Sequence, residues 1–306
     1  MTAVIQTQQL AKYYGKRRGL ESLDLEVRAG EIYGFLGPNG AGKTTTIRLL
    51  LDLLRPTGGT ATVLGADPHA GGAALRRRLG YLPGDFVVDG GQTGRELLTH
   101  LGHLRGGVPR ERIDGIADRL ELDLKARIRS LSKGNRQKIG LVQAFMHEPE
   151  LLILDEPTSG LDPLLQQTFL EMVREAKAAG QTVFMSSHVL SEVQHSADRV
   201  GIIRDGRMVA VEAVETLRRR SVRHVEIHFD NPVAPDAFVG LPGVSEVRVD
   251  GSVLRCRLAG RADGLVKMAA RYPVESILVA EPDLEELFFT YYHANGEARE
   301  EATDAA

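Results

Sequence analysis

The chain has 306 residues, with 38 Lys and Arg against 41 Asp and Glu, a single Cys and no Trp. This length predicts two domains of about 100–200 residues each, with a core that needs no disulfide or metal. One Cys excludes an internal disulfide and favours a reducing compartment. No apolar run reaches the roughly 20 residues of a membrane span, and the N-terminus lacks a signal-peptide pattern, so we expect a cytoplasmic location.

The net charge of −3 is concentrated at the C-terminus. Residues 297–306 carry four acids against one base, so they sum to −3 by themselves; they are Glu297, Glu300, Glu301, Asp304 and Arg299. The rest of the chain is close to neutral, which argues against nucleic acid as a partner. We expect residues 294–306 to be a disordered acidic tail.

The first two thirds of the chain alternate short β-rich runs with longer helical patterns, which predicts an α/β fold with a parallel sheet. We expect strands at residues 23–27, 32–36, 151–154, 182–186 and 200–204. Apolar residues recur at helical spacing between residues 93 and 125 and are interrupted near Gly106, Gly107 and Pro109. This spacing predicts a helical subdomain over about residues 90–145.

The pattern changes after Val214. Apolar and polar residues alternate over 225–229 and 244–249, which predicts a small α+β domain over residues 221–293 with a boundary near residue 220. Cys256 shares a strand face with two leucines, so we expect a buried side chain and not a reactive thiol. A basic group at the boundary is interpreted as solvated surface; its members are Arg218, Arg219, Arg220 and Arg223.

A glycine-rich stretch at residues 37–45 fits the pattern G-x-x-x-x-G-K-[ST] and lies between a predicted strand and a predicted helix. In this context backbone N–H groups and the helix N-terminus converge on phosphate oxygens. Lys43 would reach the outer phosphates, and the Thr44 hydroxyl would bind Mg²⁺.

Three side chains follow two further predicted strands. Asp155 stands at the C-terminal end of an apolar strand, where ligands bind in open α/β sheets, and is the expected second ligand of Mg²⁺. Glu156 is the candidate general base for the attacking water. His188 follows the strand at 182–186 and should project from the same edge of the sheet, to contact the γ-phosphate.

Residues 131–138, read Leu-Ser-Lys-Gly-Asn-Arg-Gln-Lys, resemble the signature motif of ATP-binding cassette (ABC) ATPases. Residues 159–162 resemble the D-loop of that family, and residues 186–188 resemble its switch-histidine strand. The resemblance covers residues 1–220 and implies a P-loop NTPase cassette with a mixed sheet and a helical subdomain.

The resemblance also implies a head-to-tail dimer of two copies, in which the signature motif of one chain covers ATP on the phosphate loop of the other. Tyr14 matches the aromatic residue that stacks on adenine, with Tyr13 left as an alternative. The implied nucleotide-binding residues are Tyr14, Gly37, Pro38, Asn39, Gly40, Ala41, Gly42, Lys43, Thr44, Thr45, Ser132, Gly134, Asn135 and Asp162. We expect the signature helix to begin around Asn135.

The sequence departs from the family pattern in two places. Lys133 and Asn135 replace the usual Gly and Gln of the signature. The Q-loop Gln is absent, since Gly84 stands near its expected position, and either Asp85 or water would take its place.

These departures resemble the exporter-type cassettes of two-gene ABC-2 systems, whose chains often end much like residues 281–289. That segment is also consistent with an amphipathic helix that packs on the small domain. The resemblance implies an ATPase subunit that powers export of a drug, antibiotic or lipidic compound. Its partner would be a separate integral membrane permease, contacted through residues 84–105, and the subunit itself would lie on the inner face of the membrane. The alternatives are an importer subunit, or a non-transport ABC ATPase that acts on DNA or ribosomes.

Overall fold

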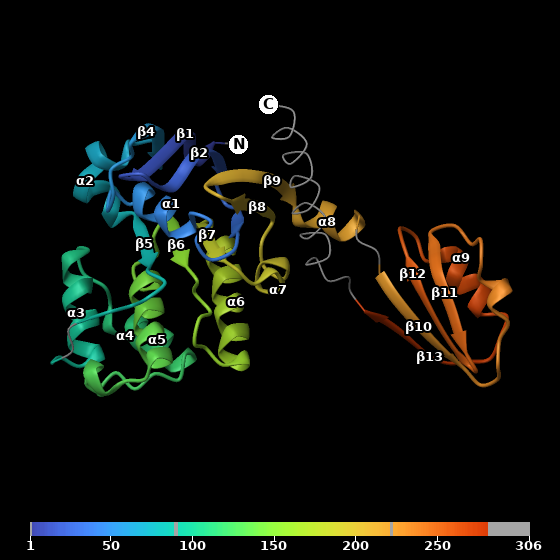
Figure 1. Cartoon of the computed structure of the whole chain (residues 1–306). Coiled ribbons are helices and arrows are strands. Elements are labelled where there is room, and N and C mark those ends of the chain that lie inside the picture. The colour runs from blue at the N-terminus through green and yellow to red at the C-terminus, as the bar shows by residue number, and fades with distance from the viewer. Residues whose placement is uncertain (1, 89–90, 221–222, 281–306) are drawn as a thin grey trace, which may run out of the picture. The chain divides into compact units, whose positions relative to one another are not determined.

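The computed structural model describes residues 2–88, 91–220 and 223–280. The chain divides into two compact units, one that ends at Glu212 and one that begins at Ala213 (Figure 1). The division lies a few residues before the boundary expected near residue 220. The reason is that helix α8 (Val214–Arg220), which contains part of the basic group, starts the second unit.

The first unit is built on a nine-stranded mixed sheet in the order β4-β1-β2-β9-β8-β3-β7-β6-β5. Strands β5, β6, β7, β3 and β8 are parallel neighbours, whereas β1 pairs antiparallel with β2 and β4. The bounds are β1 Ala3–Tyr14, β2 Arg17–Arg28, β3 Ile32–Leu36, β4 Gly58–Val63, β5 Leu79–Leu82, β6 Leu151–Asp155, β7 Thr182–Ser187, β8 Arg199–Arg204 and β9 Arg207–Ala213. All five predicted strands are present, and β1, β4, β5 and β9 add to them.

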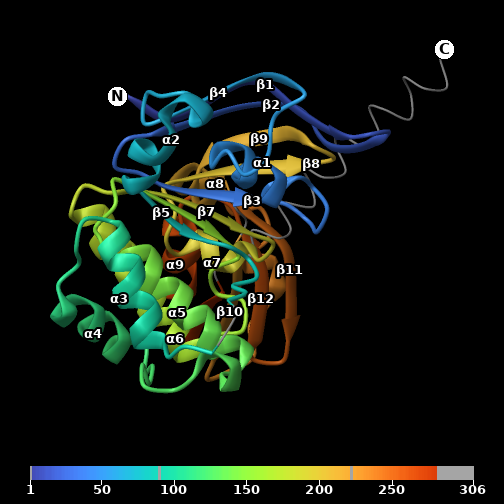
Figure 2. The same cartoon turned by 90° about the vertical axis from the view of Figure 1, so that its left-hand side faces the viewer.

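Helices connect the parallel strands and cover the sheet. The helices of this unit are α1 Lys43–Leu50, α2 Pro68–Arg77, α3 Gly94–Leu104, α4 Arg110–Arg119, α5 Lys133–Phe145, α6 Pro163–Ala178 and α7 Leu190–Gln194, with a 3-10 turn η1 at Ile128–Ser130. Helices α3, α4 and α5 gather at the end of the unit away from β1, β2 and β4 (Figures 1 and 2). The predicted break between α3 and α4 is confirmed at Gly106, Gly107 and Pro109.

A continuous apolar core fixes where the strand ends lie. Side chains from β1, β2 and β4 pack with helix α1 against the central strands β3, β6 and β7. Tyr33 and Phe35 of β3 contact Phe184 of β7, with ring centroids 5.9 and 5.3 Å apart. Strands β3, β7 and β6 are parallel neighbours, so their carboxyl ends lie at one edge of the sheet. The fully buried aromatic rings hold β3 and β7 together there.

The second unit is a four-stranded antiparallel sheet in the order β11-β12-β10-β13, which agrees with the predicted α+β class. The bounds are β10 Arg223–Phe229, β11 Val244–Asp250, β12 Val253–Leu258 and β13 Val274–Ala280, with helix α9 at Asp263–Ala269 and a 3-10 turn η2 at Pro235–Ala237. It has an apolar core of its own, which includes Phe229, Phe238 and Leu265. Cys256 is buried in this core between Leu254 and Leu258, as predicted, and burial raises the pKa of its thiol.

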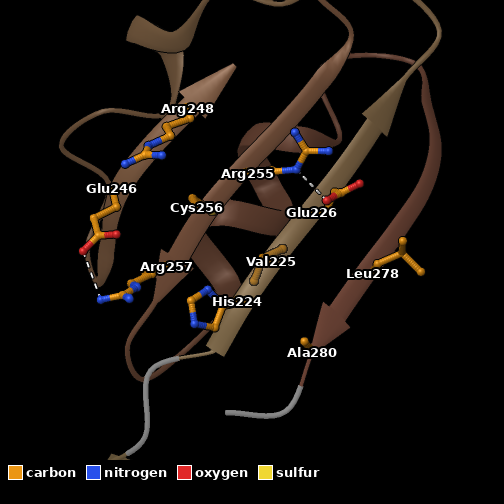
Figure 3. Close-up of a pocket in the computed structure, with 10 residues that line it drawn as sticks. All are labelled: His224, Val225, Glu226, Glu246, Arg248, Arg255, Cys256, Arg257, Leu278 and Ala280. Carbon is orange, nitrogen blue, oxygen red and sulfur yellow. Dashed lines mark hydrogen bonds and ion pairs between the residues drawn. The ribbon is translucent and has the colours of Figure 1, made fainter. Parts of the chain in front are cut away.

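The other face of this sheet is polar (Figure 3). Arg255 of β12 donates from Nε to Glu226 of β10 at 2.7 Å, and Arg257 pairs with Glu246 of β11 at 3.0 Å. These ion pairs lie on a shallow cavity of about 550 Å³ that also includes Arg248 and Leu278. The predicted tail segment at 281–289 and the tail at 294–306 lie outside the described residues. No helix in the described part of the chain is long and apolar enough to cross a membrane.

Candidate functional site

The phosphate loop runs directly from β3 into α1, as predicted. Gly42 is the N-cap of α1 and has φ of 114°, a left-handed conformation that favours glycine. A side chain there is also excluded by space, because its Cβ would lie 2.9 Å from the Gly19 carbonyl oxygen. The loop therefore leaves the N-terminus of α1 open, as an anion-binding end requires.

Lys43 lies at the centre of the candidate site and is 6% exposed. Its Nζ donates to the Gly37 carbonyl at 2.6 Å and pairs with Glu156 Oε1 at 3.2 Å. The other carboxylate oxygen of Glu156 lies 2.6 Å from Nδ1 of His188. The structure therefore places three predicted residues, from the ends of three different strands, in one chain of contacts.

Asp155 is 1% exposed at the end of β6, and the Ser186 hydroxyl donates to its Oδ1 at 2.5 Å. Carboxylate and hydroxyl oxygens are the ligands that Mg²⁺ prefers, so Asp155 and Thr44 fit the expected metal. The described residues contain no group of three or more acids, His or Cys that could hold a metal by itself. Phosphate oxygens and water would have to complete the coordination.

A cavity of about 530 Å³ lies over the phosphate loop. Tyr14 lies on its wall and is 44% exposed, whereas Tyr13 does not line it. The Tyr14 ring packs over Gly19, where an added Cβ would meet the ring at 2.6 Å. The cavity is lined by Glu156 and by most of the predicted loop residues, namely Pro38, Asn39, Gly40, Gly42, Lys43, Thr44 and Thr45. Gly37 and Ala41 are buried and do not line it.

The signature residues lie elsewhere in the unit and do not line this cavity. Ser132 is the N-cap of α5, and its hydroxyl accepts from the Asn135 N–H at 3.2 Å. The helix consequently begins at Lys133, two residues before the expected start, because the serine cap satisfies its first turn. Ser132 is exposed, and Gly134 and Asn135 are partly exposed.

The D-loop packs against the signature of the same chain. A Cβ at Gly134 would lie 2.5 Å from the Gly160 carbonyl oxygen, so only glycine fits this approach. Asp162 caps helix α6 and accepts from the N–H groups of Leu164 and Leu165 at 3.1 Å each. Asp162 therefore has a structural partner in this arrangement, and its predicted nucleotide contact stays a prediction.

Gly84, in place of the family Gln, lies beside the candidate metal acid. A Cβ at this position would be 3.4 Å from Oδ2 of Asp155. The side chain of Asp85 is exposed. The choice between Asp85 and water stays a prediction.

Several residues at the site are missing from the sequence prediction. Ser186 donates to Asp155 and also accepts from the Glu156 N–H at 3.2 Å. Gln137 of α5, 2% exposed, reaches the Glu156 carbonyl with its amide nitrogen at 3.4 Å. Both lie within motifs that the sequence marks, and a polar residue on a buried strand or helix face is the signal that could have identified them. The cavity wall further includes Arg17, Arg18 and Arg48.

Known proteins provide an independent comparison. The ABC transporter family model matches residues 20–159. The bacitracin transport ATP-binding protein BcrA of Bacillus licheniformis is 36% identical over 237 residues, which cover 76% of this chain and 76% of the relative. The daunorubicin/doxorubicin resistance ATP-binding protein DrrA of Streptomyces peucetius is 42% identical over 214 residues, which cover 68% of this chain and 65% of the relative.

The chain belongs to the ABC transporter family. A solved structure of the ATP binding subunit of an ABC transporter has a TM-score of 0.65 and 31% identity, and it covers 71% of this chain and 92% of that chain. These matches confirm the predicted cassette fold and the resemblance to drug-resistance cassettes. The protein is an ATPase of the ABC type, as the motifs predicted.

Proposed function

We propose that this protein binds and hydrolyses ATP to power the export of a small molecule through a separate membrane permease. The two relatives compared above are named for bacitracin transport and for daunorubicin/doxorubicin resistance. The substrate would accordingly be a drug, an antibiotic or a lipidic compound. The protein would act at the cytoplasmic face of the membrane.

The observation that carries the enzymatic part is the chain of contacts from Lys43 through Glu156 to His188. In the structure the Lys43 ammonium pairs with the Glu156 carboxylate. Phosphate oxygens that enter the loop would attract Lys43 and release Glu156 toward a water molecule. His188, about half exposed, would then remain beside Glu156 and the γ-phosphate.

In this mechanism Glu156 accepts a proton from the water that attacks the γ-phosphorus, while backbone N–H groups of the loop hold the phosphate oxygens. Thr44 and Asp155 would hold Mg²⁺. The metal ion would neutralise charge that develops on the phosphate oxygens. Tyr14 would stack on adenine, because it is the tyrosine that lies on the cavity wall.

The separation of the signature from the cavity supports a site shared by two chains. Ser132 lies at an accessible helix N-terminus but not over the phosphate loop of its own chain. A head-to-tail pair would bring Ser132, Gly134 and Asn135 of one copy to the γ-phosphate on the other copy. Each dimer would then hold two composite sites.

The surface near Gly84 and Arg105 is the proposed contact with the permease. Val87 and Leu104 are 78% and 61% exposed there. Phe86, which directly precedes Val87, is buried, so this end of the segment is anchored on the core. Exposed apolar side chains near an anchored segment are suited to contact a partner helix.

Cross-linking tests the shared site directly. Asn39→Cys and Ser132→Cys would be introduced into separate full-length chains that carry Cys256→Ser, and mixed chains would be oxidised with and without ATP. We expect an interchain disulfide only with ATP. The control pair has Glu111→Cys in place of Ser132→Cys. Glu111 is also exposed but lies on α4, outside the signature motif, so this pair should form no disulfide. Equal yields from the two pairs would contradict the head-to-tail arrangement.

Export is tested by co-expression with a membrane protein of about six apolar spans, if a neighbouring reading frame encodes one. We expect the two proteins to purify together and to lower the cellular content of a drug in an ATP-dependent way. Accumulation of the drug to a higher level would instead indicate import.

A further inference from the structure

Helix α7 contains a carboxylate that contacts both catalytic loops and is not part of the ATP cavity. Glu192 accepts a hydrogen bond from the Thr158 hydroxyl at 2.6 Å through Oε1. It accepts a second one from the Ser187 hydroxyl at 2.8 Å through Oε2. Thr158 follows Glu156 by two residues, and Ser187 precedes His188 by one. Glu192 therefore bridges the loop of the candidate base and the loop of the histidine.

Both donors are buried, with Thr158 5% and Ser187 2% exposed. Buried hydroxyl groups need partners, and hydrogen bonds to a carboxylate are stronger than those to a neutral acceptor. The Ser187 hydroxyl also accepts from the Val189 N–H at 2.9 Å, so the turn that carries His188 depends on its position. Loss of the carboxylate would leave the Thr158 hydroxyl without its acceptor, and it would leave the Ser187 hydroxyl only the Val189 carbonyl, at 3.2 Å.

The position of Glu192 is itself fixed by packing. Its neighbour Val193 is fully buried against β3, where a Cβ added at Gly34 would lie 2.0 Å from the Val193 side chain. Only glycine at this point of β3 lets α7 approach so closely. Helix α7 is thus seated on the strand that leads into the phosphate loop.

From this geometry we infer that Glu192 is a positioning residue for ATP hydrolysis, which holds His188 beside Glu156 by binding Ser187 and Thr158. The inference rests on the proposed function and adds to it a residue that touches no nucleotide. Glu156 has φ of 49°, a left-handed conformation that costs energy for a residue other than glycine. The bond from Thr158 to Glu192 holds the chain immediately after this strained residue.

The test compares Glu192→Ala and Glu192→Gln in the full chain. We expect the alanine variant to lose about tenfold or more in kcat, with KM and the affinity for ATP changed by less than about threefold. The glutamine variant should recover most of the activity, because one hydroxyl can donate to its oxygen and the other can rotate to accept from its nitrogen. Rates are divided by the number of ATP-binding sites, so that loss of folded protein does not count as loss of kcat.

Two sets of variants separate positioning from general stabilisation. Thr158→Val combined with Ser187→Ala should reproduce the loss caused by Glu192→Ala, and adding Glu192→Ala to that pair should lower kcat by less than about twofold more. Glu31→Gln is the matched control. Glu31 is also a nearly buried carboxylate, paired with Arg199 at 3.1 Å, but it lies away from the loops and should leave kcat unchanged.

A measurement without turnover separates this inference from the proposed function. The ring ¹⁵N signals of His188, assigned with His188→Gln, should shift in Glu192→Ala and return in Glu192→Gln, while Glu31→Gln leaves them in place. An inactive wild-type protein would overturn the proposed function, and the His188 signals would still report on Glu192. Unchanged His188 signals, an unchanged kcat of the alanine variant in an active protein, or a glutamine variant as impaired as alanine would overturn the inference.

Discussion

The two units of the chain differ in whether charged side chains are buried. In the first unit, Lys43 is almost fully buried and lines the ATP cavity, and Asp155 is almost fully buried at the end of β6. In the described part of the second unit no charged side chain is buried, and the ion pair of Glu226 with Arg255 lies on an open sheet face (Figure 3). Buried charges cost folding energy, so a fold that keeps a buried lysine on a cavity wall indicates chemistry. The buried side chains that the structure describes in the second unit are apolar and belong mostly to its core, as in a domain that this core stabilises.

The largest effect expected from this difference is at Glu156. Glu156→Gln should lower ATP turnover by about three orders of magnitude, because the amide cannot accept the proton from water. ATP binding should persist, since Lys43 and the phosphate loop remain. Turnover and binding are measured on the same preparation. Glu226→Gln in the second unit is the matched control and should retain turnover; steady turnover by Glu156→Gln would remove Glu156 as the base.

Removal of the buried cation should have the next largest effect. Lys43→Ala should weaken ATP binding by about ten- to a hundredfold, because a charge-assisted contact with phosphate is lost and Glu156 is left without its cation. Binding is measured with a fluorescent ATP analogue. Arg255→Ala removes an exposed cation of the second unit and serves for comparison. Equal affinity of Lys43→Ala and the unchanged protein would mean that the phosphate loop does not bind ATP.

Acid should destabilise the first unit before the second. Burial and the neighbouring Arg105 lower the pKa of His147 to about 4, whereas its ordinary value is 6.5. The unfolded chain then binds more protons than the folded chain between these values, so stability falls as the pH drops from 6.5 toward 4. We expect a loss of about 1 kcal/mol between pH 7 and pH 5, with allowance for partial exposure of the ring.

Thermal unfolding at the two pH values checks this expectation. His147→Gln should make the transition of the first unit less dependent on pH, because Gln does not titrate and can still accept from Arg105. The described histidines of the second unit, His224 and His228, are not buried, so its transition should change less. An equal change in both transitions would contradict the contrast between the units.

The smallest effect should come from removal of the second unit. Deletion of residues 224–306 should change ATP affinity by less than about twofold, because each unit has its own apolar core and every residue of the cavity lies upstream. The truncated protein is first shown to be folded by circular dichroism and then titrated with nucleotide. Loss of ATP binding in a folded truncation would show that the second unit contributes to the site.

The strands that could be predicted were those with simple patterns. Strands β3, β6 and β7 are buried on both faces, and each contains a run of apolar residues. Strand β1 was missed because its register against β2 shifts repeatedly and Gln9 has φ of 47°, so apolar residues do not alternate regularly along it. Edge strand β4 is mostly exposed and rich in Gly and Thr, which gives little signal.

The site residues that could be predicted were likewise those that lie within local sequence motifs. Lys43, Asp155, Glu156 and His188 each follow a strand in a pattern that marks a chemical role. Gln137, Ser186 and Glu192 act through partners that are 19 to 34 residues away in the chain, as with Thr158 and Glu192. No local pattern identifies such a pair, because the contact exists only after the strands have assembled.

The sequence by itself therefore determined the fold class, the family and the order of the motifs, since a phosphate loop and a metal carboxylate are defined by neighbours along the chain. Only the tertiary structure decided that Lys43 meets Glu156, that Gly84 lies beside Asp155, and that Glu192 binds the loops on both sides of the catalytic pair. These contacts join separate strand ends, and their distances are set by the packing of β3, β6 and β7 in one core.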